Sequence, residues 1–411
     1  MVTLWKQPVF RRLYSAQVIN TLGHEFTFIA VIGLLNELSG SGLSFAAGTV
    51  FRLLPYVITS LFSGALLENW DKRRVMLTVN LLSGVLVSLY FWVTEPAHLW
   101  VAFLLLAAIN ICSAFFQPAM QVALVESVPI EQRLAANSLL QGTKALLIIV
   151  GQGIAAVLVS FYSYRFNFLL DAACYLLSFF LLLRLPLLKQ RGGQQDDSII
   201  RRLREGLRYM WGETEIRHII YLQMAERIAG ANYILLMFYI LQERKEPLHV
   251  FGLLDIPLGL GGVLAGYLIG RWADKLHLPT MERAMGLSMI LVGGGIFFLF
   301  HVGPIWVIAV SSLLLSFASF SVIIMSVTRL QVVADARYLA RVFSLREMFT
   351  MTAFSIGCLA VGFGGEAYGS QAIATGLAVL GMLSGLCWLL AARHRARRRQ
   401  AADHKTAARS G

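Results

Sequence analysis

Long apolar stretches alternate with short polar turns along almost the whole chain. Each stretch is long enough to cross a bilayer of about 30 Å as a helix, which takes about 20 residues. The pattern predicts twelve membrane-spanning helices in two groups of six. The first six are expected at residues 14–38, 44–67, 75–93, 99–125, 136–161 and 166–185, and the second six at 218–241, 249–269, 281–300, 304–328, 342–364 and 371–392.

A polar interval separates the two groups. It opens with the letters RGGQQDDS and continues as IIRRLREGLRYMW, in which basic residues cluster against Ile, Leu and Met. That pattern predicts an amphipathic surface helix on a flexible linker, which either tethers the halves with its basic face on anionic headgroups or has a regulatory role. The expected organisation is an N-terminal bundle at 1–186, a linker at 187–216, a C-terminal bundle at 217–392 and a basic tail at 393–411.

Composition agrees with an all-α membrane protein. Hydrophobic residues make up 57% of the 411 positions and charged residues only 14%, well outside the averages of soluble domains. The net charge of +12 comes from basic residues in alternate short loops, and the outer loops hold only Arg165, Arg244 and Lys245. This asymmetry predicts that both termini are cytoplasmic. Because no basic patch with interleaved aromatics is present, we expect the bilayer, not nucleic acid, as the partner of these charges.

Two charged turns repeat about two hundred residues apart. The first is GALLENWDKRR (Gly64–Arg74) and the second is GYLIGRWADK (Gly266–Lys275). A second repeat links Met120–Ser138 with Met325–Ser344, again at equivalent helix connections. These repeats indicate an internal duplication that gives two pseudo-symmetric six-helix bundles, with a substrate path between them.

Both turns resemble the loop between the second and third helices of the major facilitator superfamily of transporters, usually written GxLxDRxGRR. Where that pattern has Asp-Arg, this chain has Glu68 and Asn69. The resemblance implies a twelve-helix fold in which charges of these turns close the cytoplasmic side. The implied gate residues are Gly64, Glu68, Asp71, Arg74, Gly266, Arg271 and Asp274.

Within that superfamily the chain is similar to the drug:proton antiporters that include macrolide-efflux proteins. The similarity is carried by strings such as FRRLYSAQVINTLG, SAFFQPAMQ and EQRLAANSLL. Three features depart from the branch. His24 and Glu25 stand where an Asp is usual after the Leu-Gly of the first helix, Gln152 replaces the proline of a Gly-Pro motif, and Lys144 replaces a small polar residue.

Nine ionisable residues fall well inside predicted spans. Each costs roughly 2.5 to 3.5 kcal/mol at mid-membrane unless it is paired or faces water, so together they predict a water-filled cavity between the bundles. The nine are His24, Glu25, Arg52, Lys144, Asp171, Glu226, Arg227, Asp255 and Glu347.

Glu25 is the expected proton carrier, because a carboxyl group in an apolar cavity can bind and release a proton near neutral pH. The alternative is a structural ion pair with Lys144 or Arg52. His24 is either a packing residue or a proton relay, and Glu226 and Asp255 are further candidates. The resemblance implies that Arg52 and Asp171 are structural charges.

Polar residues recur at helical spacing on the fourth and fifth predicted helices. They either line a substrate cavity or join helices to each other by hydrogen bonds. The cavity candidates are Asn20, Asn110, Gln117, Gln121, Gln141, Lys144, Arg227 and Glu347.

The sequence therefore predicts a secondary active exporter of amphipathic or lipophilic compounds, coupled to protons, in a bacterial cytoplasmic membrane. An exporter of an anionic amphiphile such as a siderophore or lysophospholipid is the alternative, with Lys144 and Arg227 binding the head group.

An integral-membrane enzyme or sensor is a remote alternative, since no GxxxxGK[ST], HExxH or GxSxG motif occurs. We expect a monomer without cofactor. We also expect no metal site, because the four cysteines lie inside predicted spans and lack ligand spacing.

Overall fold

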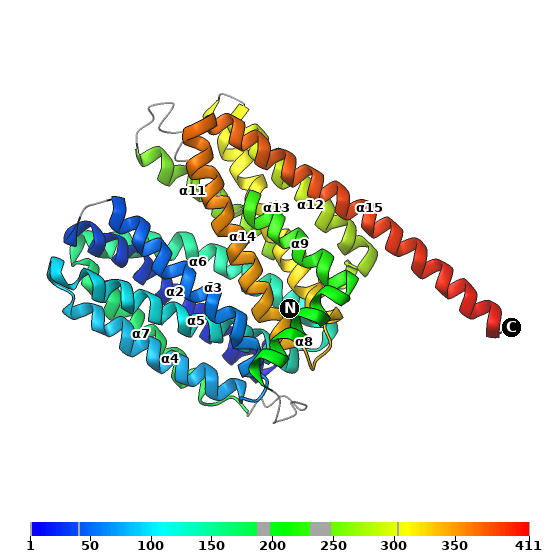
Figure 1. Cartoon of the computed structure of the whole chain (residues 1–411), viewed down its shortest axis with the longest axis horizontal. Coiled ribbons are helices and arrows are strands. Elements are labelled where there is room, and N and C mark those ends of the chain that lie inside the picture. Colours follow the sequence, from blue (N-terminus) through cyan, green and yellow to red (C-terminus); the bar gives the residue numbers. More distant parts are fainter. Residues whose placement is uncertain (1, 40–41, 187–197, 231–247, 302–303, 411) are drawn as a thin grey trace. The chain divides into compact units, whose positions relative to one another are not determined.

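The computed structural model describes residues 2–39, 42–186, 198–230, 248–301 and 304–410, and this part of the chain is built of helices (Figure 1). The helices form two compact units. Unit 1 comprises Met1–Arg217 together with Leu330–Thr352, and unit 2 comprises His218–Arg329 together with Ala353–Gly411. The segment 330–352 therefore packs with the N-terminal half of the chain, although its sequence belongs to the C-terminal half.

The first half of the chain forms one long helix for each predicted span, and a shorter helix follows in the linker. Three short 3-10 turns, η1 (Tyr90–Trp92), η2 (Pro96–His98) and η3 (Ile130–Gln132), connect some of them. The helices are α1 (Val2–Trp5), α2 (Pro8–Leu38), α3 (Gly42–Leu67), α4 (Lys72–Leu89), α5 (Leu99–Ser127), α6 (Arg133–Phe161), α7 (Tyr164–Leu182) and α8 (Ile199–Gly212).

The second half follows the same plan. The predicted span 218–241 is described only as far as Gly230, because residues 231–247 lie outside the described part of the structure. The helices are α9 (Thr214–Ala229), α11 (Leu248–Arg271), α12 (Leu278–His301), α13 (Ile305–Val333), α14 (Leu339–Tyr368) and α15 (Ser370–Ser410), with the 3-10 turn η4 (Ala273–Lys275) after α11.

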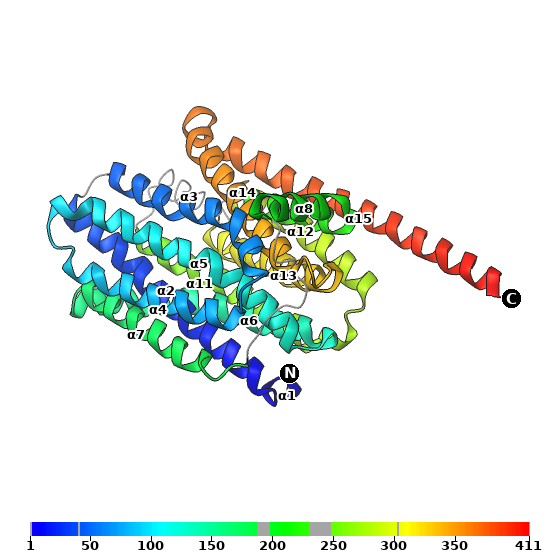
Figure 2. The same ribbon diagram turned by 60° about the horizontal axis from the view of Figure 1, so that its bottom comes forward.

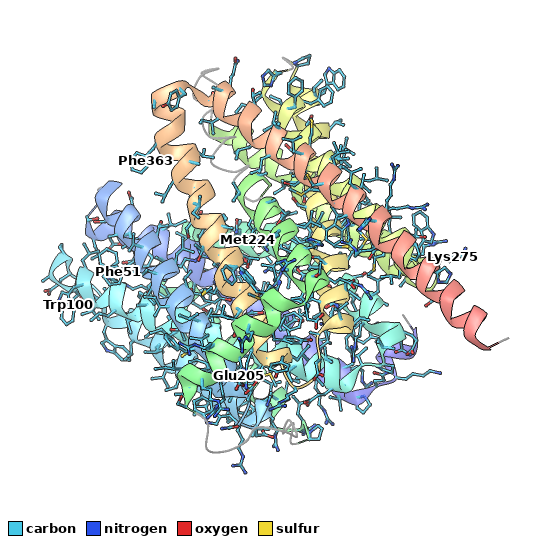
Figure 3. All side chains as sticks on the ribbon, turned by 45° about the vertical axis from the view of Figure 1, so that its right-hand side comes forward. Phe51, Trp100, Glu205, Met224, Lys275 and Phe363 are labelled. Carbon is cyan, nitrogen blue, oxygen red and sulfur yellow. The ribbon has the colours of Figure 1, made fainter. Side chains whose placement is uncertain are left out.

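Ten helical stretches among the described residues are long and apolar enough to cross a membrane, and Ile256–Arg271 is a shorter apolar helix. The predicted all-α membrane fold is confirmed, and among the described residues the predicted spans fall on the observed helices. Large apolar side chains such as Phe51 and Trp100 in unit 1, and Phe363 in unit 2, are exposed on the helix surfaces (Figure 3). Such exposure is expected where lipid tails, not water, surround a protein.

An aromatic core holds the helices of unit 1 together at the end away from the linker. α2 packs along α7, and α4 packs against both α5 and α7 (Figure 2). The rings of Tyr90 and Phe168 stack with centroids 4.5 Å apart, and the Tyr90 hydroxyl donates to the Ala102 carbonyl at 2.9 Å. Stacked rings and a satisfied hydroxyl fix the position of α7 relative to α4 and α5.

In unit 2, α12 and α15 approach closely over much of their length (Figure 1). Glycine permits this contact. A Cβ added at Gly385 would lie 2.6 Å from the carbonyl oxygen of Gly286, too close for any side chain. Small residues at such crossings are typical of helix packing in membranes, where close backbone approach supplies dispersion energy.

Phe168→Ala should lower the free energy of unfolding by about 3 kcal/mol, because it removes a fully buried ring and leaves a cavity beside Tyr90. Thermal unfolding of the purified protein in detergent measures the loss. Phe180→Ala is the matched control, since Phe180 lies on the same helix and is 60% exposed. Equal losses in the two variants would contradict the assignment of Phe168 to the core.

Candidate functional site

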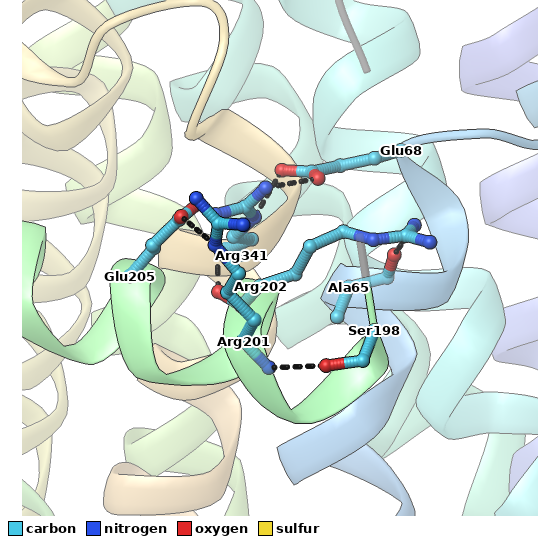
Figure 4. Close-up of polar contacts among 7 residues, drawn as sticks. All are labelled: Ala65, Glu68, Ser198, Arg201, Arg202, Glu205 and Arg341. Carbon is cyan, nitrogen blue, oxygen red and sulfur yellow. Dashed lines mark hydrogen bonds and ion pairs between the residues drawn. The ribbon is translucent and has the colours of Figure 1, made fainter. Parts of the chain in front are cut away.

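Arg341, at the start of α14, is the centre of a buried ionic cluster in unit 1. Its guanidinium pairs with Glu68, which follows α3, and its Nη1 lies 3.2 Å from Oε2 of Glu205 on α8 (Figure 4). Arg341 and Glu68 are each about 5% exposed. We call Glu68, Arg202, Glu205 and Arg341 the clamp, because together they join α3, α8 and α14.

Helix α8 supplies two of the four members of the clamp. Its Ser198 cap accepts a hydrogen bond from the Arg201 amide at 3.3 Å, which fixes where the helix begins. The Arg202 carbonyl accepts from Arg341 Nη1 at 3.0 Å, and the Arg202 guanidinium donates to the Ala65 carbonyl of α3 at 3.0 Å (Figure 4). α8 is therefore packed between α3 and α14 and is not a loose tether.

Arg202 also compensates for a departure from the family pattern. Asn69 stands where that pattern has arginine. With the Asn69 amide turned so that its oxygen faces the guanidinium, this oxygen accepts from Arg202 at 2.9 and 3.2 Å. The positive charge missing from the turn is thus supplied by the linker helix.

The pKa of the Glu68 carboxyl depends on its burial and on its contact with Arg341. Burial raises the pKa of the Glu68 carboxyl above its ordinary value, because low-dielectric surroundings penalise the charged form, whereas the hydrogen bond and charge of Arg341 lower it. Without the arginine, a buried carboxyl would lack its main compensation.

Close backbone approach accompanies the ionic contact. A Cβ added at Gly64 would lie 2.1 Å from Ser344 Oγ and 2.6 Å from the Ala340 carbonyl oxygen, so only glycine lets α14 rest on α3 here. Nearby, Tyr209 of α8 stacks on Tyr338 with centroids 4.3 Å apart. The tightness of this contact makes it sensitive to any added side-chain volume.

A second polar contact holds the end of α13 in unit 1. The Gln331 amide donates to Gln121 at 2.8 Å and accepts from Asn137 at 2.8 Å, while Arg133 donates to the Gln331 carbonyl at 2.7 Å. Gln121, a predicted cavity residue, is hydrogen-bonded to Gln331. Both ends of the segment 330–352 are thus attached to the N-terminal helices.

The other predicted gate residues have different surroundings. Asp71 caps α4 by accepting from the Arg74 amide at 2.8 Å, and the Arg74 side chain is exposed. In the second turn, Gly266 is buried in unit 2, Arg271 donates to the Tyr267 hydroxyl at 2.9 Å, and Asp274 is exposed in η4. The repeated turns therefore match in sequence, but only the first contributes its acid to the clamp.

Glu25 lies in the interior of the N-terminal bundle and is 7% exposed. Gln152 of α6 donates to its Oε2 at 2.7 Å. The shifted acid and the residue that replaces the branch's proline are therefore in contact with each other. Gly151 makes this possible, since a Cβ there would lie 3.0 Å from the Glu25 Cβ. The charges of Lys144 and Arg52 also act on this carboxyl.

A cavity of about 110 Å³ lies beside Glu25 within unit 1. Apolar side chains of α2, α3 and α5 form much of its wall, and its polar lining includes His24, Arg52, Asn110 and Asp171. This volume has room for several water molecules. His24 lines the cavity, and its Nδ1 lies 4.0 Å from Glu25 Oε1, so the imidazole is near both the cavity and the carboxyl.

Both predicted structural charges are at this cavity. Asp171 is 1% exposed and rests against Gly23, where an added Cβ would lie 2.2 Å from its Oδ1. Arg52 lies over the Phe28 ring, 5.0 Å from its centroid. Their position at the wall gives the cavity a carboxyl and a guanidinium group on different helices.

The remaining predicted cavity residues are dispersed. Asn20 donates to Asn80 at 3.0 Å between α2 and α4, and Glu347 accepts from Tyr56 at 3.3 Å and pairs with Arg346. Asn110 lines the cavity with its amide hydrogen-bonded to Leu106 of its own helix. Gln117 and Gln141 are half-buried on α5 and α6, and Lys144 is exposed on α6.

In unit 2, Glu226 and Arg227 form an ion pair with Nε and Oε2 3.7 Å apart. Glu226 is buried at 2% exposure. The side chain of Asp255 lies outside the described part of the structure.

Sequence reasoning missed Arg341, Arg202, Glu205 and Gln331 as functional residues. A signal was available for two of them, because Gln331 and Arg341 fall in the repeated segment Met325–Ser344. The linker residues carried no such signal. Which basic residue of an amphipathic helix faces inward depends on what the helix packs against.

Comparison with known proteins shows which protein families and structures the chain resembles. Residues 13–340 match the family model of the Major Facilitator Superfamily. The chain is 22% identical over 374 residues to macrolide efflux protein A of Streptococcus pyogenes, covering 86% of this chain and 88% of that protein. It is 26% identical over 186 residues to a Na(+), Li(+), K(+)/H(+) antiporter of Planococcus maritimus, covering 44% and 42%.

A similar fold is also found among solved structures. The crystal structure of a bacterial homologue of the iron transporter ferroportin, in an outward-facing state, aligns with a TM-score of 0.74 at 15% identity, over 94% of this chain and 98% of that one. At this identity the likeness shows the fold alone.

Gly64→Val should separate α14 from α3, because the added side chain would overlap Ser344 and the Ala340 carbonyl. The measurement is the rate at which a soluble maleimide labels Ser344→Cys in a background without the native cysteines; Ser344 is 1% exposed in the intact contact. Labelling is expected to accelerate about tenfold or more, as for a contact weakened by over-packing of 1 to 3 kcal/mol.

The matched control is Gly153→Val, since nothing lies within 4 Å of a Cβ at Gly153. If labelling of position 344 is equally slow in Gly64→Val and in this control, α3 does not cover α14 in the way described.

Proposed function

The chain belongs to the Major Facilitator Superfamily, and we propose that it is a proton-driven exporter of amphipathic or lipophilic compounds that works by alternating access. Family membership makes it a multi-pass membrane transporter of small molecules, not an enzyme, and confirms the resemblance seen in its sequence. The outward direction and the substrate class rest on the similarity to macrolide efflux protein A along most of both chains.

The observation that carries proton coupling is the environment of Glu25. A buried carboxyl that accepts one hydrogen bond from Gln152 and lies 4.0 Å from His24 has a route for protons through the neighbouring cavity. Water in the cavity delivers a proton to His24, and the imidazole passes it to Glu25. Protonation removes the charge that Gln152, Lys144 and Arg52 stabilise, which changes the balance of forces between α2 and α6.

The clamp serves as the cytoplasmic gate in this proposal. The distribution of basic residues supports a cytoplasmic location for this end of unit 1. The segment 330–352 joins the clamp from the C-terminal half of the sequence, so opening toward the cytoplasm requires it to leave α3 and α8. Proton binding at Glu25 and release of the clamp would then be successive steps of one cycle.

The wall of the cavity supports the substrate class. Phe28, Val31, Ile32 and Leu35 line it beside a few polar groups. At about 110 Å³ the cavity would have to widen during alternating access to admit a drug-sized lipophilic molecule. A relative named as a proton antiporter supports the choice of protons as the coupling ion.

Glu25→Gln should abolish export driven by a pH gradient, because glutamine keeps the shape of the side chain but cannot carry a proton. The measurement is transport of a panel of lipophilic compounds, a macrolide included, by inverted vesicles with and without an imposed gradient. Exchange of substrate across the membrane without a gradient should persist in the variant, which shows that the protein is folded and binds its substrate.

Glu95→Gln is the control, since Glu95 is an exposed acid in the turn before α5. Undiminished gradient-driven transport in Glu25→Gln would exclude Glu25 as the proton carrier. Absence of transport by the parent for every compound would instead overturn the substrate class.

A further inference from the structure

Helix α8 has two faces with different surroundings. Its inner face carries Arg202, Gly206 and Met210, all buried, and Gly206 lies so close to Arg341 that an added Cβ would be 2.9 Å from the arginine Cδ. This face holds the clamp closed through Arg202 and Glu205 (Figure 4). It has no room for another partner.

The outer face is exposed and strongly basic. Arg201, Arg204 and Arg208 lie on it, and Ile200 and Trp211, which are 71% and 38% exposed, lie along one edge of the same face. At 100° per residue these five positions fall within about one third of the helix circumference. Arginines beside an apolar edge with a tryptophan are typical of helices that rest in the membrane interface.

The position of α8 places this helix at the level where an apolar span ends. α8 packs against α3 next to Ala65, where the apolar span of α3 ends at Leu67. A helix at that depth meets lipid headgroups, with Ile200 able to enter the acyl boundary. The Trp211 ring stacks on Phe349 of α14 with centroids 5.0 Å apart, so only its exposed edge is open to lipid. Guanidinium groups bind phosphate oxygens with two parallel hydrogen bonds, which gives three arginines a strong preference for anionic headgroups.

We propose that the outer face of α8 binds anionic phospholipid and that the bound lipid holds the clamp closed. Arg204 and Arg208 are separated by a few residues from Arg202 and Glu205 on one rigid helix of 14 residues. Lipid that fixes the outer face therefore also fixes the inner face against α3 and α14. A ligand shifts an equilibrium only by its differential affinity for the two states, and here the lipid binds α8 in its clamped position. This lipid site is additional to the proposed export function.

Labelling of Ser344→Cys by a soluble maleimide tests the proposal on the full-length protein in nanodiscs, in a background without the native cysteines. Nanodiscs contain phosphatidylcholine alone or phosphatidylcholine mixed with phosphatidylglycerol. Phosphatidylglycerol should slow labelling several-fold in the parent. In Arg204→Gln/Arg208→Gln the lipid effect should vanish, because two arginines near an anionic surface together contribute roughly 2 kcal/mol, or about thirtyfold in affinity.

Two further variants separate lipid binding from the strength of the clamp. Lys6→Gln/Arg11→Gln removes the same charge from exposed positions near the N-terminus and should keep the lipid effect. Glu205→Gln removes a clamp residue and should accelerate labelling in both kinds of nanodisc. These readouts do not depend on transport, so failure of the export proposal would leave them unchanged.

Three results would overturn the lipid site. The first is labelling that is independent of phosphatidylglycerol in the parent. The second is a lipid effect that survives in Arg204→Gln/Arg208→Gln. The third is equal protection by a soluble polyanion such as RNA in phosphatidylcholine nanodiscs, which would assign the basic face to a different partner.

Discussion

The structure of unit 1 depends on keeping one buried positive charge fully compensated. Arg341 is 5% exposed, and an arginine cannot lose its proton to escape the cost of burial. Glu68, Glu205 and the Arg202 carbonyl supply that compensation from two other elements. Removing one partner of such a buried group is strongly destabilising, because it leaves an uncompensated charge.

Two departures from the family pattern have compensating contacts. Asn69 leaves the first turn without its arginine, and Arg202 of the linker helix takes up that position against Ala65 and Asn69. Gln152 replaces a proline, and its amide hydrogen-bonds Glu25. In both cases a change at one site is matched by a side chain from a distant element. Taken one motif at a time, the sequence lacks an arginine in the first turn and a proline in the fifth helix. The fold shows that a side chain from another element contacts each of these positions.

The linker between the halves has a larger role than connection. The sequence left a tether and a regulatory element as alternatives for the segment after residue 198. The inner face of α8 contributes Arg202 and Glu205 to the clamp, the proposed gate, and its outer face keeps the basic character that suggested contact with lipid. A lipid-bound tether and a regulatory element are compatible roles, because each would use a different face of α8.

The sequence by itself determined the all-α membrane fold and its apolar spans, since hydropathy depends on neighbouring residues, and it pointed to Glu25 and the first charged turn as candidates. Only the tertiary structure decided the partners. Glu68 and Arg341 are 273 positions apart, and Glu25 and Gln152 are 127 apart. It also decided that Arg202 faces inward while Arg204 faces outward on the same helix. Such choices follow from which surfaces the helices bury against each other, and that packing is a property of the whole fold, not of any local stretch.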